Sequence, residues 1–191
     1  MDSSISEEHI SIIGTSYLYP IATLLEDLKS LKQMGNNELQ ASSYENGYAV
    51  SIIVLTILLL ESIVARVKLH KAHESMNSRS PVEFIQTAYP ESGFENKIIE
   101  LFIIRDVIVH NHIWKAEFTS DSQGEMARVG NPKLQSGYGD RKYKNKTDSF
   151  IQKTKLLQLN VYPTRICYSD VLIVLRATVE FLLFLEKEER K

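Results

Sequence analysis

Residues 48–67 read YAVSIIVLTILLLESIVARV, and this stretch decides the fold. It is apolar on almost every side until Glu61, which is typical of a helix surrounded by other elements at the centre of a bundle. The apolar run ends at Glu61, short of the ~20 residues that a membrane span needs, and a carboxylate inside a bilayer would be costly. We therefore expect a buried core helix over about 43–74 and no transmembrane helix.

The segments around this stretch carry further helix signals, each with its own start or stop. Pro20 should break or kink an N-terminal helix, and Gly35 is typical of the end of that helix. Two capping boxes, at Ser80–Glu83 and Ser92–Glu95, should open a short helix and a long one. The last helix should begin after Ser169 as its N-cap. In addition to the central helix, we expect helices over about 10–34, 80–89, 93–118 and 169–188.

Residues 119–168 interrupt this helical pattern before the last helix. Glycine and polar residues over 119–150 predict a long loop, and the β-branched and aromatic residues of 150–168 favour a short strand or hairpin. We expect a single all-α domain over 1–191. It should be an up-and-down bundle of four or five helices with a loop or short β insertion at 119–168.

Charge and cysteine content restrict the partners and the compartment. The 22 Lys and Arg residues nearly balance the 24 Asp and Glu residues, so the formal net charge is −2. A protein held on nucleic acid by bulk charge is therefore excluded, and a nucleic-acid partner needs a local basic patch. The single cysteine, Cys167, cannot form an internal disulfide, and the polar, acidic start lacks the pattern of a secretory signal. We expect a cytoplasmic protein.

In the segment FENKIIELFIIRDVIVHNHIW (94–114), residues 98–104 are apolar apart from Glu100. Polar residues then appear among apolar ones: Arg105, Asp106, His110, Asn111 and His112. Burying such groups costs several kcal/mol unless they are paired, so they need partners, a cleft or another subunit. Asp106 and His110 are four residues apart and can touch, whereas Arg105 and His112 share one helical stripe. Arg105 and His110 are offset by about 140° around the axis, but the long arginine lets them flank one cleft.

The run Arg105-Asp106-Val107-Ile108-Val109-His110 resembles the R-x4–6-H motif of HEPN domains. Its Ile-Val-His ending is similar to the HEPN toxins of HEPN–MNT toxin–antitoxin pairs. The resemblance implies a helical bundle that forms a homodimer and acts as a metal-independent endoribonuclease without a cofactor. Similarity at the level of residues covers about 105–112. The segments 8–118 and 169–188 are similar only in helix layout, and 119–168 has no counterpart.

The chain departs from the toxin branch at one position. Those toxins often have tyrosine two residues after the motif histidine, and this chain has His112 there. Control through modification of that tyrosine is therefore not expected. His112 also satisfies the motif, so both His110 and His112 are candidates for the catalytic histidine; we favour His110 because the surrounding residues align with it.

These residue types suit RNA cleavage, in which the 2′-hydroxyl of the RNA is the nucleophile. Histidine can act as base or acid near neutral pH, and the permanently charged arginine grips phosphate oxygens. Asp106 can orient His110 and hold its tautomer. By resemblance, the products end in a 2′,3′-cyclic phosphate, and two motif helices meet in a homodimer. The expected partners are RNA, a second copy of the chain, and an antitoxin or regulatory protein.

The most basic stretch of the insertion is a candidate RNA-binding segment. Its cationic and aromatic side chains can contact phosphates and stack on a base. They belong to Arg141, Lys142, Tyr143, Lys144 and Lys146. The alternative interpretation is a solvated loop, which charge runs often are.

Two alternatives remain open for the polar residues of 94–114. The protein can be a non-catalytic helical interaction module in which Asp106 and His110 form a structural pair. A metal site from Asp106, His110 and His112 is disfavoured, because His-x-His places the two rings on opposite sides of a helix. Glu61 should be a paired carboxylate, with Arg105 as its candidate partner.

Overall fold

The computed structural model describes residues 14–35, 38–71, 80–110, 113–120, 122–124, 126–136, 145–148 and 151–190. The chain is predominantly α-helical, as predicted. Its helices are η1 (Gly14–Tyr17), α1 (Leu18–Ser30), α2 (Ser43–His70), α3 (Pro81–Ala88), α4 (Glu95–Val109), η2 (Pro163–Arg165) and α6 (Tyr168–Glu189). Its strands are β1 (Ile113–Ser120), β2 (Met126–Ser136), β3 (Thr147–Asp148) and β4 (Lys153–Thr154).

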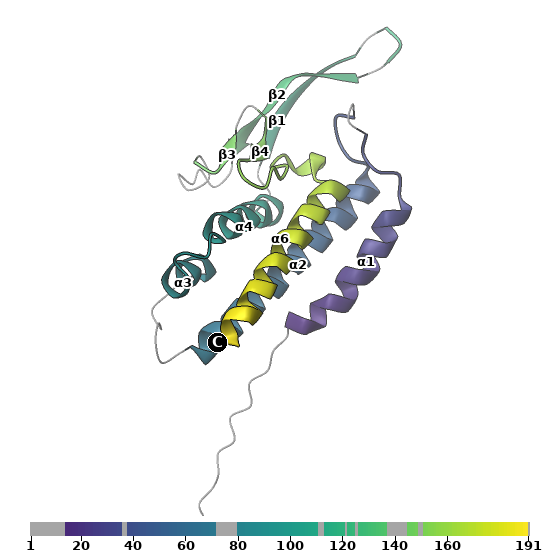
Figure 1. The fold of residues 1–191 in the computed structure, drawn as a ribbon. Helices are drawn as coiled ribbons and strands as arrows, with labels where there is room; N and C mark the ends of the chain where they lie inside the picture. The colour runs from purple at the N-terminus through teal and green to yellow at the C-terminus, as the bar shows by residue number, and fades with distance from the viewer. Residues whose placement is uncertain are drawn as a thin grey trace, which may run out of the picture.

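Helix α2 is the centre of the bundle, as its apolar sequence predicts. It contacts η1, α1, α3, α4 and α6. Ile52, Ile53, Ile57 and Leu60 have at most 1% of their surface exposed, and each such side chain stabilises the fold by about 1.5–3 kcal/mol. The chain runs up through α1, down through α2, up through α4 and down through α6 (Figure 1). This course matches the expected up-and-down bundle.

Among the described residues, α2 is also the one helix that is long and apolar enough to cross a membrane. The segment Ser43–Leu69 has 27 residues. Its most apolar 18-residue window has a mean hydropathy of 2.3, and 44% of that window is buried in the protein. A single helix of this kind is weak evidence for a span, because the core helix of a bundle meets the same criteria. The cytoplasmic location and the absence of a membrane partner therefore stay predictions.

The first helix is shorter than predicted and does not break at Pro20. Helix α1 begins at Leu18, so Pro20 lies in its first turn. Backbone N–H groups there have no partner within the helix, and proline is tolerated. The helix ends at Ser30, four residues before the expected end, and residues 1–13 lie outside the described part of the chain.

Two predicted helix starts also need correction. The capping box at Ser80–Glu83 opens α3 as expected, but Ser92 accepts a hydrogen bond from the N–H of Phe94, and α4 begins at Glu95. Helix α6 begins one residue before Ser169, with Cys167 as its N-cap. The reason is Asp170, whose buried carboxylate accepts a hydrogen bond from the N–H of Cys167 at 3.0 Å. A carboxylate at this position satisfies a free N–H of the first turn.

The expected helix over 93–118 is wrong beyond its first part. Helix α4 ends at Val109, and Ile113–Ser120 forms strand β1. This strand pairs antiparallel with Met126–Ser136, so part of the expected loop over 119–150 is strand β2. The physical reason is that Ile113, Trp114, Phe118 and Thr119 are β-branched or aromatic, and such residues fit a strand once a partner is available. In Figure 1 the β1–β2 hairpin projects beyond the end of the helices.

The second half of the insertion is anchored to α4. The short strand predicted over 150–168 is present as β4, but its antiparallel partner β3 lies in the segment that was predicted to be a loop. Glu100 of α4 has 1% of its surface exposed. Its two carboxylate oxygens accept hydrogen bonds from the N–H groups of Leu156 (2.8 Å) and Leu157 (2.7 Å). This residue therefore fixes the insertion against the bundle.

The Cys167 thiol should react slowly with Ellman's reagent in the native protein. Burial raises the pKa of this thiol, and the thiolate is the reactive form. We expect native labelling at pH 8 to be about 100-fold slower than labelling in denaturant. Because the pKa is raised in the folded state, the free energy of unfolding depends on pH. The contribution of the thiol is complete below its ordinary pKa of about 8.5 and is lost as the pH rises through the higher pKa of the folded state. Equal labelling rates would contradict this burial.

Candidate active site

Arg105 is the point at which the apolar surface of α4 turns polar. Four consecutive residues before it, from Leu101 to Ile104, are buried, and so is Asp106 after it. The side chain of Arg105 keeps 26% of its surface exposed. Its guanidinium lies over the ring of Phe102, 4.7 Å from the ring centroid, which adds a cation–π contact. The helix thus places a positive charge where the buried core meets an open surface.

Two carboxylates hold the guanidinium. Arg105 donates from Nε (3.0 Å) and Nη2 (2.8 Å) to Oδ1 of Asp106, and from Nη1 to Oε1 of Glu61 on α2. Burial alone would lower the pKa of Arg105, but the hydrogen bonds with Asp106 and the charge of Glu61 outweigh it and raise the pKa. The guanidinium is therefore permanently charged and fixed in orientation, as a bidentate anion site requires. The expected pairing of Glu61 with Arg105 is present.

His110 lies at the other end of this polar segment. It is the C-cap of α4, its side chain is exposed, and its backbone N–H donates to the carbonyl of Asp106 at 3.0 Å. The imidazole is thus open to solvent, five residues beyond Arg105. His112, the other candidate histidine, lies outside the described residues.

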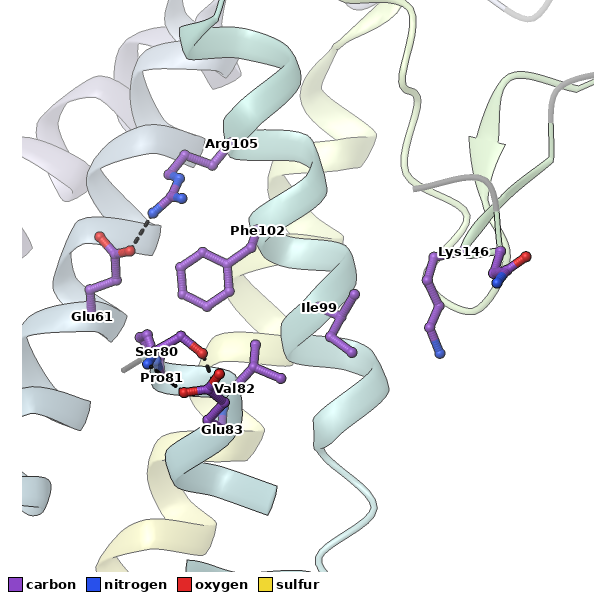
Figure 2. Close-up of a pocket in the computed structure, with 10 residues that line it drawn as sticks. Glu61, Ser80, Pro81, Val82, Glu83, Ile99, Phe102, Arg105 and Lys146 are labelled. Atoms are coloured by element: carbon purple, nitrogen blue, oxygen red, sulfur yellow. Dashed lines mark hydrogen bonds and ion pairs between the residues drawn. The ribbon is translucent and has the colours of Figure 1, made fainter. Parts of the chain in front are cut away.

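A cavity of about 510 Å³ opens beside Arg105, between α2, α3 and α4. Figure 2 shows the side chains of Glu61, Phe102 and Ile99 around it, with Lys146 on the far side of the view. His110 is not among the described residues that line this cavity. Within one chain, Arg105 and His110 therefore do not share this cavity.

Lys146 is the one residue of the predicted RNA-binding stretch that the structure describes. Its ammonium group donates to Oδ1 of Asn96 at 2.6 Å, and its side chain lines the cavity beside Arg105. The insertion therefore brings a second cation to this cavity. The other predicted RNA-binding residues, Arg141, Lys142, Tyr143 and Lys144, lie outside the described part of the chain.

Sequence reasoning did not identify the apolar wall of the cavity. Ile99 and Phe102 line it together with Arg105. The three are spaced three residues apart, which on a helix places them along one face. That spacing is the signal that would have found them, but the apolar composition of 98–104 hid it, since every face of such a helix looks like core.

The described residues contain no group of three His, Cys, Asp or Glu side chains arranged to hold a metal ion. His112, which the metal alternative needs, lies outside them.

Searches of protein-family models, of curated proteins and of solved structures each found no match to this chain.

Proposed function

We propose that the protein is a metal-independent endoribonuclease that cleaves RNA through attack of the 2′-hydroxyl, as a toxin or antiviral effector. The observation that carries the proposal is the fixed, permanently charged guanidinium of Arg105, with a quarter of its side chain open, five residues before the exposed imidazole of His110. Arginine would hold the scissile phosphate, and histidine would remove the proton of the 2′-hydroxyl as a base or give a proton to the leaving 5′-oxygen as an acid. RNA would be the substrate, and an antitoxin or regulatory protein a further partner.

The proposal includes a second copy of the chain. Five residues separate Arg105 from His110, which is an offset of about 140° on a helix, and the cavity beside Arg105 is not lined by His110. Cleavage of a phosphodiester bond needs a cation, a base and an acid around one phosphate. Two α4 helices facing each other across a homodimer would supply two arginines and two histidines to one cleft.

The positioning role of Glu61 and Asp106 also follows from the contacts. Together they bind Nε, Nη1 and Nη2 of Arg105, so the guanidinium cannot rotate freely. Preorganised charge costs no reorganisation when the substrate arrives, which is how fixed donors stabilise a transition state. A phosphate would share the guanidinium with these carboxylates or displace Glu61.

The same contacts favour a second candidate, a non-catalytic helical interaction module. Three nitrogens of Arg105 already bind carboxylates of its own chain, and a structural ion pair needs nothing more. Helix α6 also exposes an apolar stripe, because Leu172, Val179 and Leu183 are 41%, 52% and 60% exposed and lie on one face. Such a stripe suits a protein partner.

The two candidates differ in what the purified protein does to RNA. The protein is incubated with end-labelled single-stranded RNA in EDTA, and the chemistry of the new 3′ ends is mapped. An endoribonuclease of the proposed kind leaves 2′,3′-cyclic phosphates and 5′-hydroxyls, and EDTA does not slow it. Replacing the 2′-hydroxyl by hydrogen at the cut site should stop cleavage there. Intact RNA at high protein concentration would favour the interaction module.

A further inference from the structure

The cavity beside Arg105 has the size and lining of a small-molecule site. Its volume of about 510 Å³ lies in the range of 300–1,000 Å³ that such sites usually have. Most of its lining is apolar, and a few charged groups converge on it. That combination fits a ligand with a flat apolar body and polar groups at its edges.

The wall formed by α3 and α4 suits a nucleobase. Val82, Ile99 and Phe102 present aliphatic and aromatic surface, and the guanidinium carbon of Arg105 lies over the Phe102 ring, 4.7 Å from its centroid. Bases of single-stranded RNA stack on aromatic rings and on arginine planes in this way. The cavity therefore offers a stacking surface next to the proposed phosphate position.

Glu61 gives the cavity an acceptor for the edge of a base. Its hydrogen bond with Arg105 uses Oε1, and among the described residues this is the one interaction of its carboxylate. The side chain is 28% exposed, so Oε2 can accept a hydrogen bond from a ligand. Guanine presents two adjacent donors, N1–H and the N2 amino group, and a carboxylate accepts from both. Adenine, cytosine and uracil lack this pair of donors.

Lys146 supplies a cation away from Glu61. Figure 2 shows the two side chains on opposite sides of the view, with Phe102 and Ile99 between them. One of the three ammonium protons of Lys146 is used by Asn96, which leaves donors for a phosphate. A nucleotide whose base meets Glu61 would place a phosphate toward Lys146.

We propose that this cavity binds a guanine nucleotide, and that it selects a guanine next to the bond that is cut. The second part rests on the proposed ribonuclease function, whereas binding of the free nucleotide does not. Glu61 then recognises the base edge, the α4 wall stacks the ring, and Lys146 holds a flanking phosphate.

The first experiment measures binding of 5′-GMP, 5′-AMP, 5′-CMP and 5′-UMP to the purified full chain by calorimetry. GMP should bind about 10-fold or more tightly than the others, the discrimination that a two-donor contact gives. Filling the cavity by Ile99→Trp, and removing the cation by Lys146→Ala, should each weaken GMP binding about 10-fold or more. The matched control Lys115→Ala, at an exposed lysine of β1, should bind as wild type.

Glu61→Gln should remove the preference for GMP while binding of the other nucleotides stays unchanged. Melting temperatures identify any variant that fails to fold, and Lys146→Ala, at a partly exposed side chain, keeps the test decisive if Ile99→Trp unfolds. Equal binding of all four nucleotides, or GMP binding that these variants leave intact, would overturn the proposal.

The second experiment sequences the RNA ends that wild type and Lys146→Ala produce. Enrichment of guanine beside the cut in wild type supports the subsite. Cleavage without base preference, together with no GMP binding, would overturn the subsite and leave the ribonuclease standing. GMP binding without any RNA cleavage would remove the ribonuclease and leave the nucleotide site.

Discussion

Replacing Arg105 by alanine should reduce the rate of RNA cleavage by about 10³-fold, the usual effect of removing a preorganised donor that stabilises transition-state charge. The substitution also leaves Glu61 and Asp106 without their cation. Since Asp106 is buried but Glu61 is partly exposed, we expect a loss of about 1–3 kcal/mol in the free energy of unfolding. Single-turnover cleavage of a labelled RNA and denaturant unfolding measure the two effects separately.

Three further variants separate catalysis from stability. Arg105→Lys keeps the charge but loses the planar guanidinium. Compared with Arg105→Ala, it should therefore restore the free energy of unfolding more than the cleavage rate. His110→Ala removes an exposed side chain. It should fold as wild type and lose about 10²–10⁴-fold in rate, as loss of a general acid or base does. Arg176→Ala, at an exposed arginine of α6, is the matched control and should keep full activity. Wild-type rates for both Arg105→Ala and His110→Ala would end the ribonuclease proposal.

The central part of this fold was predictable because its signals are strong and local. A long apolar run bounded by polar residues has few stable alternatives to a core helix, and α2 is that helix. The pairing of Glu61 with Arg105 followed from the same physics, since a charge in an apolar helix needs a partner. A cation and an anion in the apolar segments of two different helices of one bundle are obvious candidate partners for each other.

The end of α4 was not predictable from the same reasoning. Val107, Ile108 and Val109 are β-branched, and so is Ile113, so helix and strand patterns overlap through this segment. What decides the outcome is the pairing of β1 with β2, whose residues lie up to 23 positions apart. Local patterns do not contain such long-range pairing. The shift in the helix end also matters for function, because it makes His110 a helix terminus with an exposed side chain.

The cavity was not predictable for a related reason. It depends on how the start of α3, the middle of α4 and the insertion meet, and only the α4 residues leave a periodic pattern in the sequence. Lys146 was selected as an RNA-binding residue because of its charged neighbours. Its contact with Asn96 and its place in the cavity come from the tertiary fold.

The largest stability effect should come from Glu100→Ala. The substitution leaves the N–H groups of Leu156 and Leu157 without their acceptor and opens a void at a side chain that is 1% exposed. We expect the free energy of unfolding to fall by about 2–4 kcal/mol. An unpaired buried donor costs about 1–3 kcal/mol, the cost is smaller at the exposed Leu156, and the void adds to this. Glu100→Gln keeps one acceptor oxygen and should have an intermediate effect.

The matched control is Glu180→Ala, which removes an exposed carboxylate that pairs with Lys97 of α4 at 2.8 Å. Surface pairs contribute little to stability, so this variant should unfold almost as wild type does. If the two variants are equally stable, Glu100 does not anchor the insertion.

Glu100 should also affect ligand binding in the cavity beside Arg105. The N–H of Lys155, next to Leu156, donates to the carbonyl of Lys146 at 2.8 Å. Loosening Leu156 and Leu157 therefore frees the strand pair that positions the Lys146 ammonium. In Glu100→Ala, limited proteolysis should cut the insertion faster than in wild type, and GMP binding should weaken under conditions where the bundle is still folded. Unchanged proteolysis and unchanged GMP binding in that folded variant would show that Lys146 is held by contacts other than this chain of hydrogen bonds.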